Sequence, residues 1–309
     1  MKYGQVQGLT KPVSRIGLGS VMFSPDQLEL SGELLDSFVE QGGNCIDTAW
    51  VYGKGAAEKA VGAWIEDREV RDQIVLIGKG AATARSTPEM VTTQLAESLE
   101  RLRTSYIDLY LMHRDNVEVP VGEFVECLNK EHRAGRIHAF GGSNWTTKRI
   151  EEANAYAASH GLAGFVASSP NFSLAVWNEP RWIDCLSASD KASREWYRRA
   201  NIALFAWSSQ AAGFFTGRYS ETDLESPGTK EMAKVWFNES NFQRLRRAQE
   251  LAERRGVTPN QVALAYVLCE SPRTFALIGP ERIEELRESV AALELELSES
   301  ERRWLNLES

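Results

Sequence analysis

The chain has 309 residues, of which 43% are hydrophobic and 25% charged, with 23 glycines and only 10 prolines. This composition indicates a globular protein with a large core, and it excludes disordered, collagen-like and low-complexity classes. Acidic residues outnumber basic ones by 43 to 35, without a long basic run, and no apolar stretch approaches the roughly 20 residues of a spanning helix. We therefore expect a soluble cytoplasmic protein with neither nucleic acid nor membrane as a partner.

The sequence offers no metal site and no disulfide framework. Its four cysteines and four histidines are scattered along the chain. They form neither a CxxC pair nor the HExxH spacing of a zinc site. We expect reduced thiols and no bound metal.

Short apolar runs alternate with amphipathic stretches along the chain, which is typical of a parallel sheet with helical crossovers. The runs expected as strands are residues 15–20, 44–48, 74–79, 107–112, 138–143, 165–168, 203–207 and 275–279. Thr-Pro start signals at residues 87 and 258 and a capping box at Ser298 mark the beginnings of three helices. Further helices are expected near residues 31–41, 121–134, 147–160, 191–200, 240–255 and 260–270.

Eight strands separated by helices favour one α/β domain over residues 1–309, a closed (β/α)₈ TIM barrel. No Pro/Gly/Ser-rich linker divides the chain. A doubly wound sheet is the alternative, weakened because GLGS at 17–20 and GKGAAE at 53–58 match the GxGxxG turn poorly. The first 14 residues precede the first strand and are expected to form a small cover.

Polar residues stand where neighbouring strands end, which is where such barrels place their active sites. Asp47 and Lys79 end the second and third expected strands, His113 follows the fourth, and Tyr52 lies five residues after Asp47. Lys and Asp at adjacent strand ends form an ion pair, and the ammonium lowers the pKa of a nearby phenol from about 10. Each residue alone has an ordinary structural explanation, but together they predict an acid–base site built on Tyr52.

These residues and their surroundings resemble the aldo-keto reductase superfamily over nearly the whole chain. The shared segments, in the family's order, are IDTAWVYG, IGK, DLYLMH, GGSN, WSSQAAGFFTGR and a closing IGP turn. The resemblance implies that Tyr52 is the general acid and that Lys79 lowers its pKa. It further implies that Asp47 pairs with Lys79 and that His113 orients the substrate carbonyl. The implied reaction is metal-free hydride transfer from a reduced nicotinamide to a carbonyl carbon.

The same resemblance implies a set of cofactor-binding residues. Ser143 and Asn144 match a pair that hydrogen-bonds the carboxamide, and Trp207 matches a ring that stacks on the nicotinamide. Ser169 stands where many relatives use Gln, so that contact is shorter or replaced. The loop expected to pass the pyrophosphate carries Ser208, Gln210, Gly213 and Arg218.

The closing turn bears on the choice between NADP and NAD. It reads Gly279-Pro280-Glu281-Arg282, with Glu285 and Ser289 where some relatives have Arg and Asn. Arg282 is the one obvious partner for a 2′-phosphate, and Glu281 beside it repels such a group. Family habit favours NADP, with NAD as the alternative.

Aromatic and apolar side chains in the loops are expected to line the substrate site, namely Met22, Phe23, Trp50, Trp145 and Trp177. The segment 175–182 is expected to be a specificity loop. The leading prediction is an NAD(P)H-dependent reductase of a small aldehyde, ketone or sugar-like substrate. Two alternatives stay open: a cofactor-binding regulatory subunit, as in relatives attached to potassium channels, and an alcohol or sugar dehydrogenase working oxidatively. The chain is a monomer or a homo-oligomer.

Overall fold

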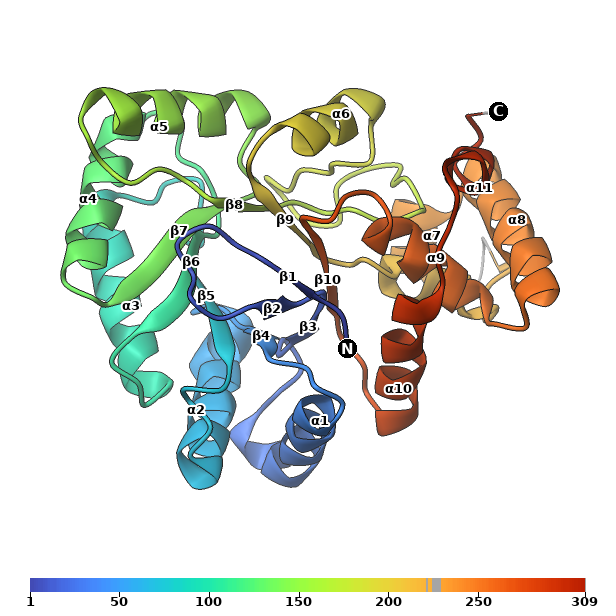
Figure 1. Cartoon of the computed structure of the whole chain (residues 1–309), viewed down its shortest axis with the longest axis horizontal. Coiled ribbons are helices and arrows are strands. Elements are labelled where there is room, and N and C mark those ends of the chain that lie inside the picture. The colour runs from blue at the N-terminus through green and yellow to red at the C-terminus, as the bar shows by residue number, and fades with distance from the viewer. Residues whose placement is uncertain (221, 224–228, 309) are drawn as a thin grey trace.

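The computed structural model describes residues 1–220, 222–223 and 229–308. Eight parallel strands close into a barrel in the order β10-β3-β4-β5-β6-β7-β8-β9. Helices surround the strands (Figure 1), so the expected (β/α)₈ architecture is confirmed. The barrel strands are β3 (Ile16–Gly19), β4 (Cys45–Asp47), β5 (Val75–Gly80), β6 (Ile107–Met112), β7 (Ile137–Ser143), β8 (Ala167–Ser169), β9 (Ala203–Ala206) and β10 (Thr274–Ile278).

The expected helix starts are present. The side chains of Thr87, Thr258 and Ser298 each accept a hydrogen bond from a backbone N–H of the first turn, and the last two complete capping boxes. The helices are α1 (Leu28–Glu40), α2 (Ala56–Arg68), α3 (Pro88–Arg101), α4 (Val121–Arg133), α5 (Thr147–Ser159), α6 (Lys191–Arg199), α7 (Lys230–Trp236), α8 (Glu239–Arg255), α9 (Pro259–Leu268), α10 (Ile283–Ala291) and α11 (Glu299–Leu305).

Helix α2 is an element that the apolar pattern did not reveal. Its buried face includes alanines and Gly62 as well as larger side chains, which weakens the periodic signal. A Cβ added to Gly62 would lie 2.3 Å from the carbonyl oxygen of Arg101, at the end of α3. Small residues therefore let α2 pack closely against its neighbour, and this same property hides the helix in the sequence.

The interior of the barrel is filled by alternate residues of the strands. Cys45 of β4, Ile77 of β5 and Leu111 of β6 belong to this inner apolar cluster. The adjacent residues of the same strands, such as Ile46 and Leu76, face the helices. Successive side chains of a strand point to opposite faces. The next inward positions are therefore Asp47, Lys79 and His113, at the carboxyl ends of the strands.

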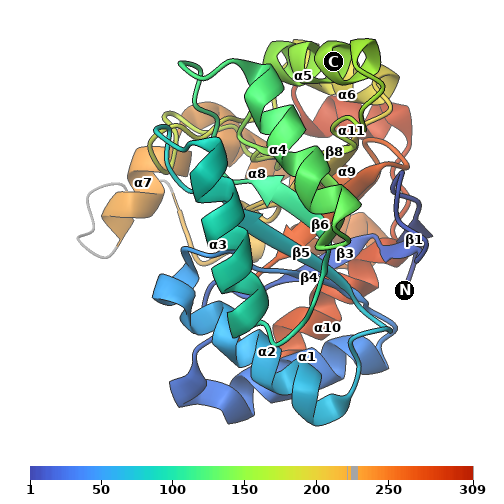
Figure 2. The same ribbon diagram turned by 90° about the vertical axis from the view of Figure 1, so that its left-hand side faces the viewer.

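The amino end of the barrel is covered by the short hairpin of β1 (Tyr3–Gly4) and β2 (Val13–Ser14). Val6 and Val13 pack against the inner apolar cluster, as expected for a small cover. Strand β1 and helix α7 lie at opposite ends of the barrel (Figure 2). The carboxyl-end loops thus form the mouth where the site residues gather. Within the described residues, no helix is long and apolar enough to cross a membrane.

Candidate active site

A buried ion pair lies at the carboxyl ends of β4 and β5. Asp47 Oδ1 is 2.5 Å from Lys79 Nζ, and both side chains are at most 5% exposed. Lys79 Nζ also donates to the Thr48 carbonyl and to the Tyr52 hydroxyl, at 3.3 and 3.2 Å. Burial alone would lower the pKa of Lys79, but Asp47 and Tyr52 raise it above its ordinary value. Lys79 therefore remains an ammonium group inside the mouth of the barrel.

Tyr52 begins the short helical turn η2 (Tyr52–Gly55), which follows β4. Burial raises the pKa of its phenol, and the Lys79 ammonium offsets only part of that increase. The expectation that Lys79 brings this pKa below its ordinary value is thus not met, because desolvation is the larger effect. Tyr52 stays protonated throughout the neutral range, which is the state that a proton donor requires.

His113 completes the group from the end of β6. Its ring lies 5.8 Å from that of Tyr52 in an edge-on arrangement. Burial and the charges of Lys79 and Arg114 hold its pKa well below the ordinary value, so the imidazole is neutral. Its Nδ1 is buried without a hydrogen-bond partner among the described residues. The structure thus brings the four residues singled out in the sequence into one cluster.

Trp50 flanks this cluster. Its backbone N–H donates to the Lys79 carbonyl at 2.8 Å. Its indole Nε1 donates to Glu97 at 2.7 Å, and the Arg101 guanidinium lies 5.4 Å from the ring centre. The loop after β4 is therefore fastened to both β5 and α3, which holds Tyr52 in position.

Ser143, Asn144 and Ser169 lie side by side at the ends of β7 and β8. The hydroxyls of Ser143 and Ser169 donate to the carbonyls of Ser169 and Phe205 at 2.7 and 2.8 Å. Asn144 has a positive φ of 58°, and its Oδ1 accepts from Leu186 N–H at 3.2 Å and from Trp207 Nε1 at 3.3 Å. The two hydroxyls therefore serve the barrel wall, while Asn144 and Trp207 are joined at its rim.

The loop after β9 has a backbone suited to an anion. Ser208, Ala211, Ala212 and Gly213 all have positive φ, around the short turn η3 (Ala211–Thr216). Such conformations bring successive N–H groups to one side, and TIM barrels often bind phosphate between the loops after their last two strands. Gln210 Nε2 donates to Ser289 Oγ at 3.0 Å, which connects the loop after β9 to α10.

The loop after β10 is open but carries a neutralised cation. A Cβ added to Gly279 would have no described heavy atom within 4 Å beyond those of Gly279 and its two chain neighbours. Arg282 donates to Glu285 at 2.8 and 3.3 Å. Partial burial acts to raise the pKa of Glu285, but the Glu281 N–H and Arg282 and Arg218 together lower it below its ordinary value. The guanidinium of Arg282 therefore already has a carboxylate partner.

The residues expected to line the substrate site are divided between surface and core. Met22 is 65% exposed after β3, whereas Phe23 is buried. Trp177 contacts Trp207 and Trp236, with ring centres 5.8 and 6.4 Å apart. Residues Met22, Trp50 and Trp177 thus lie in loops of the mouth.

Trp145 requires a correction. Its side chain is 1% exposed and packs against Phe124 and Phe165, with ring centres 6.1 and 4.9 Å away. The residue follows Asn144, but its side chain packs between α4 and the segment that leads into β8. We therefore assign it to the core rather than to the expected substrate site.

Two residues at the mouth were given no individual role from the sequence, although Trp182 ends the segment 175–182 that was expected to be a specificity loop. Trp182 is half exposed, with its ring 5.5 Å from that of Trp207. Arg114 donates to the His113 carbonyl at 2.8 Å and to Cys185 Sγ at 3.1 Å. The available signal for Arg114 was a charged residue directly after the strand-end histidine. The signal for Trp182 was its place in the expected specificity loop.

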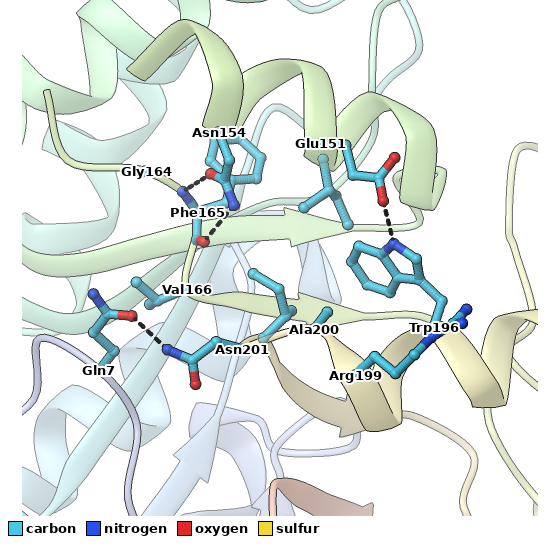
Figure 3. Close-up of a pocket in the computed structure, with 12 residues that line it drawn as sticks. Gln7, Glu151, Asn154, Gly164, Phe165, Val166, Trp196, Arg199, Ala200 and Asn201 are labelled. Atoms are coloured by element: carbon cyan, nitrogen blue, oxygen red, sulfur yellow. Dashed lines mark hydrogen bonds between the residues drawn. The ribbon is translucent and has the colours of Figure 1, made fainter. Parts of the chain in front are cut away.

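A cavity of about 650 Å³ lies elsewhere, between α5, α6 and the starts of β8 and β9 (Figure 3). Its polar groups bond to one another: Asn154 to the Phe165 backbone, Gln7 to Asn201 and Trp196 to Glu151. None of the acid–base residues lines it. We therefore place the chemistry at the mouth, not in this cavity.

The model of the aldo/keto reductase family matches residues 15–305, and the chain belongs to this family. It is 30% identical to norsolorinic acid reductase stcV of Emericella nidulans, over 94% of this chain and 76% of that protein. It is 26% identical to aldo-keto reductase yakc [NADP(+)] of Schizosaccharomyces pombe, over 93% and 86%. A solved aldo/keto reductase from Klebsiella pneumoniae, in complex with NADP and acetate, is 25% identical with a TM-score of 0.72, over 99% of this chain and 94% of that one.

Proposed function

We propose that this protein reduces the carbonyl of an aldehyde, ketone or sugar-like compound to an alcohol, with Tyr52 as the general acid. The observation that carries the proposal is the contact of the Tyr52 hydroxyl with Lys79 Nζ at 3.2 Å, beside a neutral His113. A phenol held against an ammonium is suited to release a proton, because the resulting phenolate is stabilised at once.

The roles of the four residues follow from their charges. Tyr52 gives its proton to the carbonyl oxygen as negative charge develops there. Lys79 stabilises the phenolate that remains, and Asp47 keeps Lys79 charged and oriented. Neutral His113 carries one N–H, which donates to the same oxygen and orients the carbonyl.

The residues present fit a nicotinamide dinucleotide. The left-handed segment after β9 offers backbone N–H groups to a pyrophosphate, and Asn144 and Trp207 stand between it and the acid–base group. When bound, the dinucleotide supplies the hydride. We propose NADPH as the first choice, supported by the NADP-bound Klebsiella relative, and NADH as the alternative, supported by the pairing of Arg282 with Glu285.

The rim of the mouth favours an apolar or aromatic substrate. Exposed apolar side chains follow β3, β4, β6 and β8, namely Val21, Met22, Val51, Val117, Trp182 and Ile183. Apolar side chains that gather on one exposed surface commonly mark a site that binds a ligand or a partner. Aromatic aldehydes and ketones are therefore the first compounds to test. The cytoplasmic location expected from the sequence stays a prediction.

The test is a spectrophotometric assay of the purified protein with NADPH and with NADH. A panel of aromatic, aliphatic and sugar aldehydes is expected to give turnover that depends on Tyr52. Cofactor binding without turnover in either direction would instead support a regulatory subunit. Faster oxidation of alcohols than reduction of the matching carbonyls at neutral pH would support the dehydrogenase alternative.

A further inference from the structure

Arg114 occupies the mouth beside the acid–base group. Its guanidinium bridges two loops, because it donates to the His113 carbonyl after β6 and to Cys185 after β8. Asn144 lies between these loops: its Nδ2 donates to the same carbonyl at 3.4 Å, and its Oδ1 accepts from Leu186. The guanidinium is therefore held across the loops that follow three consecutive strands.

Among the described residues, no carboxylate oxygen lies within 4 Å of a nitrogen of this cation. The neighbouring acid, Asp115, pairs instead with Arg149 at 3.1 Å. Burial raises the pKa of Cys185, so its sulfur contacts Arg114 as a neutral thiol. A thiol is a weak acceptor that cancels no charge. Arg114 thus has no ion pair within the described part of the chain, and its Nε has no protein acceptor there.

The charge of Arg114 acts on the reacting groups. It lowers the pKa of His113 and opposes the burial-induced rise in the pKa of Tyr52. The guanidinium donates to the backbone carbonyl of His113, the residue proposed to orient the substrate carbonyl. A half-buried, uncompensated cation is unfavourable unless it binds an anion.

We propose that Arg114 binds a carboxylate on the substrate, so that the preferred substrates are carbonyl compounds that carry a carboxylate apart from the reacting carbonyl. The turn that holds Cys185 also holds Trp182, whose carbonyl accepts from the Cys185 N–H at 3.3 Å. If an aromatic ring joins the carbonyl and the carboxylate of the substrate, Trp182 provides an apolar surface for that ring beside the guanidinium of Arg114. This inference rests on the proposed reductase function.

The experiment compares 3- and 4-carboxybenzaldehyde with their methyl esters, using the purified protein and its preferred cofactor. The ester and the acid have nearly the same shape and differ in charge. The ester is the more electron-poor and more reactive aldehyde, so intrinsic reactivity opposes the expected preference. We expect at least one acid to have a kcat/KM about tenfold or more above that of its ester, the scale of a hydrogen bond to a charged group.

Two variants separate anion binding from a purely structural role. Arg114→Gln removes the charge while keeping a donor for the His113 carbonyl. Arg114→Lys keeps the charge but lacks the two parallel N–H groups with which a guanidinium binds a carboxylate. The ratio of acid to ester kcat/KM cancels any shared effect on Tyr52. We expect this ratio to fall to one or below in Arg114→Gln, because the ester is intrinsically the more reactive, and to stay clearly above one in Arg114→Lys.

Four results have distinct meanings. If the esters are reduced but neither acid is preferred, the carboxylate site is overturned while the reductase function stands. If Arg114→Gln lowers both activities and leaves the ratio unchanged, Arg114 only braces the loops, and the inference is again overturned. If neither kind is reduced while other carbonyl compounds of the panel are, this inference is overturned and the reductase function stands; if no member of the panel is reduced, both fail.

Discussion

Two buried charge clusters occupy opposite ends of the same barrel, and they differ in how completely they are paired. At the amino end, Asp108 pairs with Lys11 at 2.9 Å and with Arg71 at 2.8 Å, and it accepts from the Leu76 N–H at 3.0 Å. At the carboxyl end, Asp47 and Lys79 form one pair, and Lys79 also contacts Tyr52.

The difference distinguishes structure from chemistry. Each oxygen of Asp108 has a cationic partner, Lys11 for Oδ1 and Arg71 for Oδ2. At the mouth, His113 Nδ1 lacks a partner among the described residues, and the Tyr52 hydroxyl lies against an ammonium. Incompletely satisfied polar groups inside a protein are unfavourable, and the one on His113 fits the proposed role of donating to or accepting from a bound substrate.

The largest expected effect concerns the mouth. Tyr52→Phe removes the proton donor and keeps the ring, so kcat should fall by about 10² to 10⁴, whereas the Kd of the cofactor should hardly change. Steady-state kinetics and titration of tryptophan fluorescence measure the two quantities. Equal kcat in the variant would refute the assignment of the general acid.

The matching change at the amino end should affect stability instead. Asp108→Asn leaves Lys11 and Arg71 without their carboxylate, and we expect the free energy of unfolding to fall by about 3 kcal/mol. The exposed Asp67, which pairs with Arg68 at the surface, provides the control: Asp67→Asn should change stability by less than about 1 kcal/mol. Urea unfolding measures both. A loss of kcat in the folded Asp108→Asn protein would remove the contrast between the clusters.

A smaller effect is expected in the pH profile. Because burial raises the pKa of Tyr52 and lowers that of His113, kcat/KM should change little between about pH 6.5 and 10, the ordinary values of the two groups. Lys79→Met removes the charge that stabilises the phenolate, so the alkaline decline should move to higher pH as the rate falls. An alkaline decline at the same pH in a still-active variant would contradict this coupling.

The smallest expected effect concerns the choice of cofactor. Glu285→Gln removes the carboxylate that pairs with Arg282, and the freed guanidinium should increase NADP⁺ affinity relative to NAD⁺ by about tenfold or less. Glu284→Gln has the same change in net charge on an exposed neighbour and serves as the control. Equal changes in both variants would show that only the overall charge matters.

Much of the fold and of the acid–base group was readable from the chain. Eight apolar runs marked the strands, and the alternation of side chains in a strand places Asp47, Lys79 and His113 one step beyond Cys45, Ile77 and Leu111. Local spacing determines such positions, because neighbouring parallel strands end at the same mouth. Helix α2 was missed because alanine and glycine carry little periodic signal.

Other properties were decided only by the tertiary structure. Trp145 is in the core because Phe124 of α4 and Phe165, just before β8, pack against it. Tyr52 has a raised pKa because the depth of burial outweighs a neighbouring charge. Among the described residues, Arg282 has a carboxylate partner whereas Arg114 has none, although both lie in loops that follow barrel strands. The strand pattern is local and therefore written in the order of residues, whereas burial and charge compensation depend on groups that folding brings together from distant parts of the chain.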